Sequence, residues 1–210
     1  MLNDKNTTPS IGYDRLRIST DGEGITTLFC FWGCPLKCKY CLNKKLLAKG
    51  KPKEMSLQEL AEKVLIDYCY FMATGGGITF GGGESLLYSG QIRAFRDVLP
   101  PDVPIKIETS LNVPMERLVE VIDVVDEYII DIKTMNSQIY EAYTGQKNQW
   151  VLDNLKLLRE KGLQDKCKIR IPNIPDFTTQ KDIDTTTAII KDMGFEILDI
   201  FDYIIRNEEE

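Results

Sequence analysis

Three cysteines are crowded into the stretch GCPLKCKYCLN, with three residues between Cys34 and Cys38 and two between Cys38 and Cys41. Two thiols could form a disulfide, but three on one short loop cannot all pair with one another. A structural zinc site usually needs a fourth ligand from a second pair of cysteines or histidines, and this chain has no such pair. Three cysteines suit a 4Fe–4S cluster that leaves one iron open to substrate or cofactor. The loop therefore predicts a catalytic iron–sulfur centre.

Composition limits the other chemistry. The chain has no histidine, which excludes Ser-His-Asp and Cys-His catalysis and leaves acid–base work to carboxylates, lysine, tyrosine or cysteine. The 32 acidic residues exceed the 26 basic ones, which argues against a nucleic-acid partner. No apolar run reaches the roughly 20 residues of a membrane helix, and the start, MLNDKNTTPS, is unlike a secretion signal. We therefore expect a cytoplasmic protein with no membrane partner and reduced thiols, in which Cys30, Cys69 and Cys167 are small core residues.

Two further groups of polar residues follow expected strands. In GGGITFGGGES (Gly75 to Ser85), glycines at a strand end let the backbone approach a ligand, and Glu84 directly after them can accept hydrogen bonds from an ammonium group. In EYIIDIK, Asp131 and Lys133 are two residues apart and should point to the same side of a strand. Arg170 in KIRIP supplies a fixed positive charge suited to a carboxylate or to ribose hydroxyls.

Short β-rich runs alternate with amphipathic helical stretches, which predicts an α/β fold with parallel strands. About six βα units are too few for a closed eight-stranded barrel, so we expect a partial, open βα barrel of about six parallel strands, with its site at the C-terminal strand ends. We expect a single domain over residues 1–210, with a core of about 18–204 and an acidic tail at 205–210. The expected strands are 25–32, 77–80, 104–109, 127–133, 166–174 and 195–204, and the expected helices are 56–72, 90–99, 113–123, two short stretches ending near 161, and 181–194.

The cysteine spacing, with the aromatic Tyr40 before the last cysteine, resembles the signature of the radical S-adenosylmethionine (radical SAM) enzymes. That resemblance implies a radical SAM type barrel with one 4Fe–4S cluster on Cys34, Cys38 and Cys41. The open iron would be chelated by S-adenosylmethionine, which is cleaved reductively to methionine and a 5'-deoxyadenosyl radical. Gly82, Gly83 and Glu84 are similar to the family's glycine-glycine-glutamate motif, which binds the methionine amino group.

Longer segments, from about Ile18 to Asp199, resemble the glycyl radical enzyme activating enzymes of the pyruvate formate-lyase activator type. The segments are DGEGITTLFCFWGCPLKCKYCLN, FMATGGGITFGGGESLL, YIIDIKTMNSQIYEAYTG and IRIPNIP. The resemblance implies an oxidoreductase that abstracts a glycine α-hydrogen from a large glycyl radical enzyme. It further implies an electron donor such as flavodoxin or ferredoxin, and transient docking of a large partner fits a monomer.

The resemblance also implies roles for individual positions. Tyr40 and Leu42 would lie on the adenine and cluster side, while Asp131, Ile132 and Lys133 would lie at the methionine end. Glu108 and Arg170 would add polar contacts. A monovalent cation beside the cofactor would be bound by Glu108, Thr109, Asp131 and the backbone of Ile129, with Glu108 in place of the family's aspartate.

The sequence departs from the activating enzymes at three points. Their late histidine has no counterpart, and we expect Tyr203 or Phe201 to supply the missing stacking surface. The chain ends soon after the sixth expected strand, so elements that help to grip the partner are expected to be missing. No insert with further cysteines lies between Cys41 and Gly75, which predicts one cluster.

Two alternative functions stay open from the sequence. One is a radical SAM enzyme that modifies a peptide or a small metabolite, and the other is a non-catalytic, cluster-binding regulatory protein. The intact cysteine, glycine-glutamate and DIK motifs argue against the second alternative, because a protein that only binds would not need all three.

Overall fold

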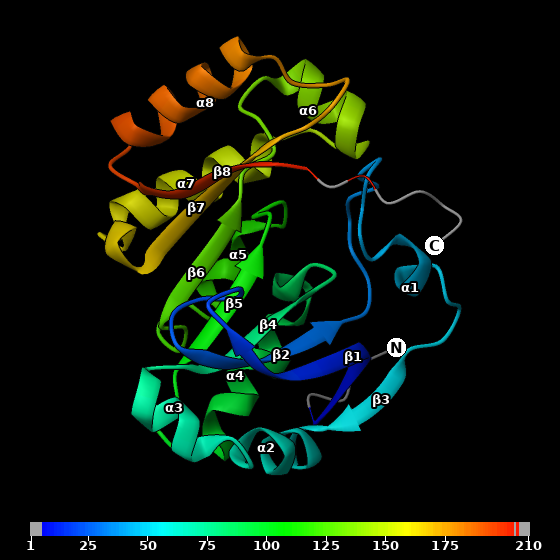
Figure 1. Cartoon of the computed structure of the whole chain (residues 1–210), viewed down its shortest axis with the longest axis vertical. Helices are drawn as coiled ribbons and strands as arrows, with labels where there is room; N and C mark the ends of the chain where they lie inside the picture. The colour runs from blue at the N-terminus through cyan, green and yellow to red at the C-terminus, as the bar shows by residue number, and fades with distance from the viewer. Residues whose placement is uncertain (1–5, 204, 206–210) are drawn as a thin grey trace.

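The computed structural model describes residues 6–203 and residue 205. Within these residues eight strands form one sheet in the order β3-β1-β2-β4-β5-β6-β7-β8, with helices packed around it (Figure 1). The end of the expected last strand, at residue 204, and the expected acidic tail from residue 206 onward lie outside the described residues.

Six strands of this sheet run parallel, as the order of βα units predicts. They are β2 (Ile25–Phe31), β4 (Gly77–Gly82), β5 (Ile105–Thr109), β6 (Glu127–Asp131), β7 (Cys167–Asn173) and β8 (Glu196–Asp202). In the described part of the chain β8 does not pair back onto β2, so the sheet stays open. The predicted open barrel is confirmed, and its strand ends meet at one edge where a site can form.

Two antiparallel strands that the sequence did not predict extend the sheet beside β2. They are β1 (Thr7–Ile18) and β3 (Lys53–Ser56). β1 contains Pro9 and Gly12, and its register shifts twice against β2, so its side chains do not follow the regular alternation that identifies a strand in sequence. Its pairing partners, rather than its own pattern, determine its conformation.

Helices cover the two halves of the sheet. Figure 1 shows α2 (Leu57–Leu65), α3 (Tyr68–Thr74) and α4 (Ser89–Val98) gathered at the lower end, and α7 (Gln149–Glu160) and α8 (Gln180–Asp192) beside β7 and β8. The shorter helical segments are α1 (Lys44–Leu47), η1 (Ser85–Tyr88), α5 (Met115–Val119), α6 (Ser137–Thr144) and η2 (Gln164–Lys166). Within residues 6–203 no helix has both the length and the apolar character needed to cross a bilayer.

The helix expected over residues 56–72 is divided into α2 and α3 at Asp67. The carboxylate of Asp67 is completely buried and accepts hydrogen bonds from Arg15 Nε (2.8 Å) and Nη2 (2.6 Å) and from Thr27 Oγ1 (3.0 Å). A buried carboxylate must be paired, and this pairing turns the chain toward β1 and β2. The division thus depends on residues that are 40 and 52 positions away in sequence.

The core lies between the sheet and these helices and includes stacked aromatic rings. Phe31 stacks on Phe80 and on Tyr88, with ring centroids 5.3 and 4.6 Å apart. Cys167 is buried, as expected for a core residue, and Cys30 is partly buried. The prediction for Cys69 is wrong, because α3 buries only Phe71 and leaves Cys69 at the surface.

Candidate active site

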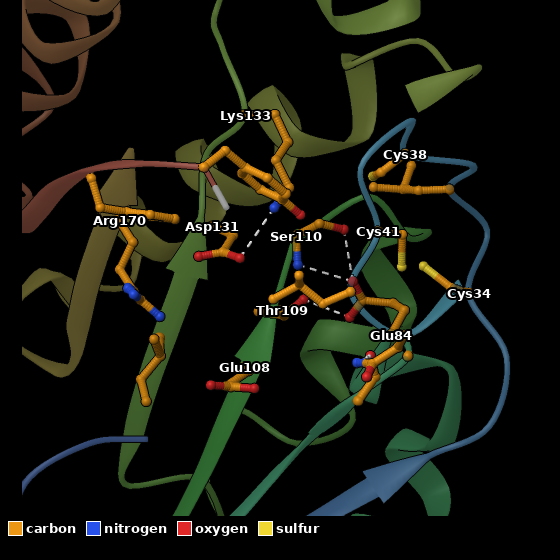
Figure 2. A pocket seen from close by; sticks show the side chains of 18 of the residues that line it. Cys34, Cys38, Cys41, Glu84, Glu108, Thr109, Ser110, Asp131, Lys133 and Arg170 are labelled. Carbon is orange, nitrogen blue, oxygen red and sulfur yellow. Dashed lines mark hydrogen bonds and ion pairs between the residues drawn. The ribbon is translucent and has the colours of Figure 1, made fainter. Parts of the chain in front are cut away.

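A pocket of about 390 Å³ opens where the parallel strands end (Figure 2). That volume is within the range of small-molecule sites, about 300 to 1,000 Å³. The pocket lies between the cysteine loop and the ends of β4 to β8. Most of the site residues proposed from sequence line it: Cys34, Cys38, Cys41, Leu42, Gly82, Gly83, Glu84, Glu108, Thr109, Ile129, Asp131, Lys133 and Arg170.

Hydrogen bonds to distant elements fix the cysteine loop, which has little regular structure of its own. The backbone N–H of Lys37 donates to the carbonyl of Thr144 (2.8 Å), at the end of α6. At the other end of the loop, Asn43 Nδ2 donates to the carbonyl of Gly82 (2.7 Å) on β4. Asn43 also lines the pocket and was missed by the sequence analysis, although its place two residues after Cys41 was a usable signal. The loop is therefore held from two sides, which fixes the direction of its thiols.

The three loop cysteines are free thiols that share one side of the pocket (Figure 2). Burial raises the pKa of Cys34 to about 12 and also raises the pKa of Cys38. The protein alone therefore keeps these two thiols protonated, and a bound metal would have to displace their protons. Among the described residues, no three cysteine or carboxylate groups converge closely enough to hold a single ion. Because a 4Fe–4S cluster takes each thiolate on a different iron, three separated thiols around an open cavity fit a cluster better than a single metal ion.

Close packing leaves no room for side chains on Gly82, which contacts Cys30 of β2, and on Gly83, which contacts the start of the cysteine loop. A Cβ atom on Gly83 would lie 2.0 Å from the carbonyl oxygen of Gly33, and Gly82 adopts a left-handed φ of +88°. The N–H of Gly83 donates to Phe31 O (3.0 Å), and the N–H of Glu84 donates to Gly33 O (2.9 Å). Both glycines also line the pocket, so their approach to a ligand stays a prediction, while the contact with Gly33 is a second reason for the absence of a side chain at Gly83.

Glu84 lines the pocket, but its carboxylate is already saturated by protein donors. Oε1 accepts from Thr109 Oγ1 (2.6 Å) and the N–H of Leu86 (3.1 Å), and Oε2 accepts from the N–H (2.9 Å) and Oγ (2.7 Å) of Ser110 (Figure 2). A carboxylate has about four acceptor positions, and all are used here. Glu84 therefore joins the end of β5 to the turn after β4, and an ammonium ligand would have to displace one of these donors.

Asp131 and Lys133 form an ion pair on the pocket wall opposite the cysteines (Figure 2). Lys133 Nζ lies 3.1 Å from Asp131 Oδ2, whereas Asp131 Oδ1 is buried without a hydrogen-bond partner in the described structure. Burial opposes the charge of Lys133, but the neighbouring carboxylate more than compensates and raises its pKa. A buried acceptor without a partner is costly, so Oδ1 is suited to receive a donor from a ligand. β6 ends at Asp131, two residues earlier than expected.

Glu108 projects into the pocket from β5 (Figure 2). Burial, with the negative charges of Asp21 and Asp131, raises the pKa of its carboxyl to about 8, although Arg170 acts in the opposite direction. Thr109, the next residue on β5, turns its hydroxyl to Glu84. Of the four proposed cation ligands, Glu108 and Asp131 therefore present carboxylate oxygens to the pocket, while the hydroxyl of Thr109 is engaged elsewhere.

Aromatic and basic side chains close the side of the pocket formed by β7 and the end of β8. The guanidinium of Arg170 pairs with Asp199 (Nε to Oδ1, 3.1 Å) and lies 4.7 Å from the ring centroid of Phe201. Lys133 Nζ lies 5.7 Å from the centroid of the Tyr203 ring. Phe201 and Tyr203 both line the pocket, in the region where a stacking surface was expected.

Two predicted site residues do not line the pocket. The hydroxyl of Tyr40 donates to Asp176 Oδ2 (3.0 Å), and its ring packs near Tyr143, at a centroid distance of 6.1 Å. That hydrogen bond and ring contact turn Tyr40 away from the cavity. Ile132 lies between Asp131 and Lys133, so its side chain points to the opposite side and is buried in the core.

A family model for the radical SAM superfamily matches residues 30–187 of this chain. The chain belongs to the radical SAM superfamily. The matched span includes the cysteine loop and strands β4 to β7, which carry most of the pocket. Membership of the superfamily implies a 4Fe–4S cluster and S-adenosylmethionine, and three free thiols around the pocket are consistent with that pair of cofactors.

Curated relatives are activating enzymes. The chain is 33% identical over 165 residues to the pyruvate formate-lyase-activating enzyme of Clostridium pasteurianum, covering 77% of this chain and 67% of that protein. It is 31% identical over 168 residues to the pyruvate formate-lyase 1-activating enzyme of Escherichia coli K12, covering 78% of this chain and 67% of that protein. It is 33% identical over 164 residues to the (2S)-3-sulfopropanediol dehydratase activating enzyme of Klebsiella oxytoca, covering 75% of this chain and 51% of that protein. The chain is thus a radical SAM enzyme of the activating-enzyme type.

Solved structures support the fold. SuiB of Streptococcus suis matches with a TM-score of 0.65 at 15% identity, over 84% of this chain and 39% of SuiB. A second structure, of SuiB bound to S-adenosylmethionine, matches with a TM-score of 0.63. This chain therefore spans well under half of SuiB, and at such low identity the similarity shows a common fold alone.

Proposed function

We propose that this protein activates a glycyl radical enzyme by abstracting the α-hydrogen of one glycine in that larger partner. The observation that carries the proposal is the pocket itself, where three thiols lie across one cavity from the Asp131–Lys133 ion pair. The names of the curated relatives support the choice of reaction. One domain would suffice for this chemistry, because the residues concerned all line one pocket.

In the proposed site, Cys34, Cys38 and Cys41 hold one 4Fe–4S cluster. When bound, the cluster supplies the electron that cleaves S-adenosylmethionine to methionine and a 5'-deoxyadenosyl radical. The electron would come from an external protein such as a flavodoxin or a ferredoxin.

The chain's own residues would bind and orient the methionine end of the cofactor. Asp131 Oδ1, which has no hydrogen-bond partner among the described residues, would accept from the amino group, and Lys133 Nζ, held by Asp131 Oδ2, would supply positive charge for a carboxylate. Arg170, fixed by Asp199, is available for the ribose hydroxyls or a carboxylate. Glu84 would act mainly by fixing the end of β5, because its own acceptor positions are occupied.

The remaining lining would exclude water and balance charge. Leu42, Phe201 and Tyr203 present apolar surface to the pocket, which favours a radical by keeping other hydrogen donors away. A monovalent cation near Glu108 and Asp131 would relieve the repulsion between these two carboxylates, a repulsion that contributes to the raised pKa of Glu108.

The test is anaerobic reconstitution with iron and sulfide, followed by reduction in the presence of S-adenosylmethionine. We expect about four irons per chain, release of 5'-deoxyadenosine, and a doublet radical signal in electron paramagnetic resonance when a glycyl radical enzyme is added. Asp131→Asn should weaken cofactor binding while leaving iron content unchanged. Glu196→Gln, at an exposed carboxylate on β8, is the matched control.

Two outcomes would replace the proposal. Cofactor cleavage without a glycyl radical on any candidate partner would favour a peptide or small-metabolite substrate. Iron binding without any cofactor cleavage would favour a regulatory protein that only binds a cluster.

A further inference from the structure

The charge of this acidic protein is distributed unevenly along the chain. The stretch from Cys34 to Lys53, CPLKCKYCLNKKLLAKGKPK, contains seven of the 26 basic residues and none of the 32 acidic ones. The rest of the chain therefore carries 19 basic residues against 32 acidic residues. We name residues 34–53 the lysine segment. It includes the cysteine loop, so its positive charges lie on the same stretch of chain as the proposed cluster ligands, while the molecule as a whole is negative.

The lysine segment is exposed, and it carries apolar residues among its charges. Its seven lysines are all exposed: Lys37, Lys39, Lys44, Lys45, Lys49, Lys51 and Lys53. Leu42 and Leu46 are 50% and 37% exposed, although both are large apolar side chains. Figure 1 shows α1, which carries Leu46, on the opposite side of the molecule from α7 and α8. Apolar side chains surrounded by charged ones are typical of a surface that binds another protein.

We propose that the lysine segment is the docking surface for an acidic protein that carries single electrons. This proposal rests on the proposed function, because reductive cleavage needs one electron per event and the chain must obtain it from outside. The carrier would give up one electron to the cluster that Cys34, Cys38 and Cys41 would hold, and that electron would be consumed in breaking one carbon–sulfur bond of S-adenosylmethionine, so the electron count balances. A carrier docked here would lie beside Cys41 and Leu42, which shortens the path for electron transfer.

Charge complementarity favours a carrier over the larger protein substrate at this surface. A carrier must bind quickly and leave after each transfer, and electrostatic attraction between small surfaces raises association rates without producing a long-lived complex. The glycine of the substrate must instead reach the interior of the pocket, between Asp131 and the thiols. The strands around that interior carry carboxylates such as Glu108 and Asp199, so they lack the positive excess of the lysine segment.

The test uses the reconstituted enzyme and an acidic bacterial flavodoxin as the probe. The variant Lys45→Glu/Lys49→Glu/Lys51→Glu reverses three charges outside the cysteine loop. The control, Lys161→Glu/Lys181→Glu/Lys191→Glu, makes the same change in net charge at exposed lysines around α7 and α8. The first readout is the affinity for oxidised flavodoxin, measured from the flavin signal at several salt concentrations. The second is the rate of cofactor cleavage with reduced flavodoxin or with dithionite.

We expect the lysine-segment variant to bind flavodoxin at least about tenfold more weakly than wild type at low salt. The difference should shrink as salt rises to about 0.5 M, since screening weakens surface charge interactions. Cleavage driven by flavodoxin should slow by a similar factor, while cleavage driven by dithionite should keep the wild-type rate. The control variant should behave like wild type with both reductants.

Three results would overturn the proposal. In the first, the lysine-segment variant binds flavodoxin with an affinity within about twofold of wild type. In the second, the lysine-segment variant and the control variant lose the same amount of flavodoxin affinity. In the third, the lysine-segment variant binds the glycyl radical enzyme more weakly but binds flavodoxin as well as wild type does. Failure of the proposed function is separate and shows itself differently. In that case wild type would not cleave S-adenosylmethionine even with dithionite, while the binding titration would still report on docking.

Discussion

Replacing Glu84 by glutamine should destabilise the protein even before any cofactor is bound. Each carboxylate oxygen of Glu84 accepts one backbone N–H, from Leu86 (3.1 Å) on one side and from Ser110 (2.9 Å) on the other. A glutamine amide has one oxygen and one NH₂ group, so in either orientation its NH₂ must face a backbone N–H donor. Glu84→Gln therefore always leaves one buried donor without an acceptor and removes the charge from the hydrogen bonds that survive.

The magnitude follows from these contacts. A hydrogen bond to a charged group contributes about 1.5 to 3 kcal/mol, and a buried donor left without a partner costs about 1 to 3 kcal/mol. Because Glu84 is only 1% exposed, water can relieve little of this loss in the folded protein. We expect the free energy of unfolding to fall by about 3 kcal/mol, which for a chain of this size lowers the thermal midpoint by about 6 to 12 °C.

The assay is urea unfolding of the iron-free protein under anaerobic conditions, with the slope of the transition checked for constancy. Glu160→Gln makes the same chemical change at an exposed position on α7 and should alter the stability by less than about 0.5 kcal/mol. A loss below about 1 kcal/mol for Glu84→Gln would refute the reasoning, because it would mean that the carboxylate does not receive these donors.

Three further predictions follow from other contacts. Cys38→Ala should abolish stable cluster binding and cofactor cleavage, as judged by iron content and 5'-deoxyadenosine; cleavage at the wild-type rate would rule out the cluster assignment. Gly83→Ala should destabilise the protein by about 2 kcal/mol or more and reduce iron incorporation, because the new Cβ would clash with the carbonyl of Gly33 in the cysteine loop. The matched control is Gly50→Ala, because a Cβ at Gly50 meets nothing within 4 Å. Asp67→Asn should cost about 2 to 4 kcal/mol at neutral pH, measured by urea unfolding, because Arg15 loses its charged partner. Pairing with Arg15 lowers the pKa of Asp67 in the folded protein. The stability that its charge contributes is therefore complete above the ordinary carboxyl pKa of about 4 and declines as the pH falls below that value. A difference in unfolding free energy between Asp67→Asn and wild type that does not shrink on acidification would contradict this pairing.

The order of elements and the position of the site could be predicted from sequence. Alternating β and α patterns gave six parallel strands, and parallel strands must present their C-terminal ends at one edge. The motifs with Cys34, Glu84 and Asp131 each lie at or just after the end of one of these strands, which is why all three reach the same pocket. Local patterns were sufficient here because both hydrophobic periodicity and motif spacing are local properties.

Other features depended on contacts between distant parts of the chain. Strand β1 is identified by its partners β2 and β3, since its own sequence lacks regular alternation. The orientation of the Tyr40 side chain depends on its hydrogen bond to Asp176, which lies 136 residues later in the chain. No local pattern contains information about such a partner.

The sequence by itself determined that this chain carries three thiols on one loop, no histidine, and six strands that bring the motifs together. The tertiary structure decided what those motifs do within the fold. It showed that Gly83 accommodates the carbonyl of Gly33 and that Glu84 is occupied by Thr109 and Ser110. It also left one oxygen of Asp131 as a buried acceptor without a partner in the part of the chain that the structure describes. The physical reason is that residue type and spacing determine which groups are available, whereas packing determines which of their hydrogen-bonding positions remain free for a ligand.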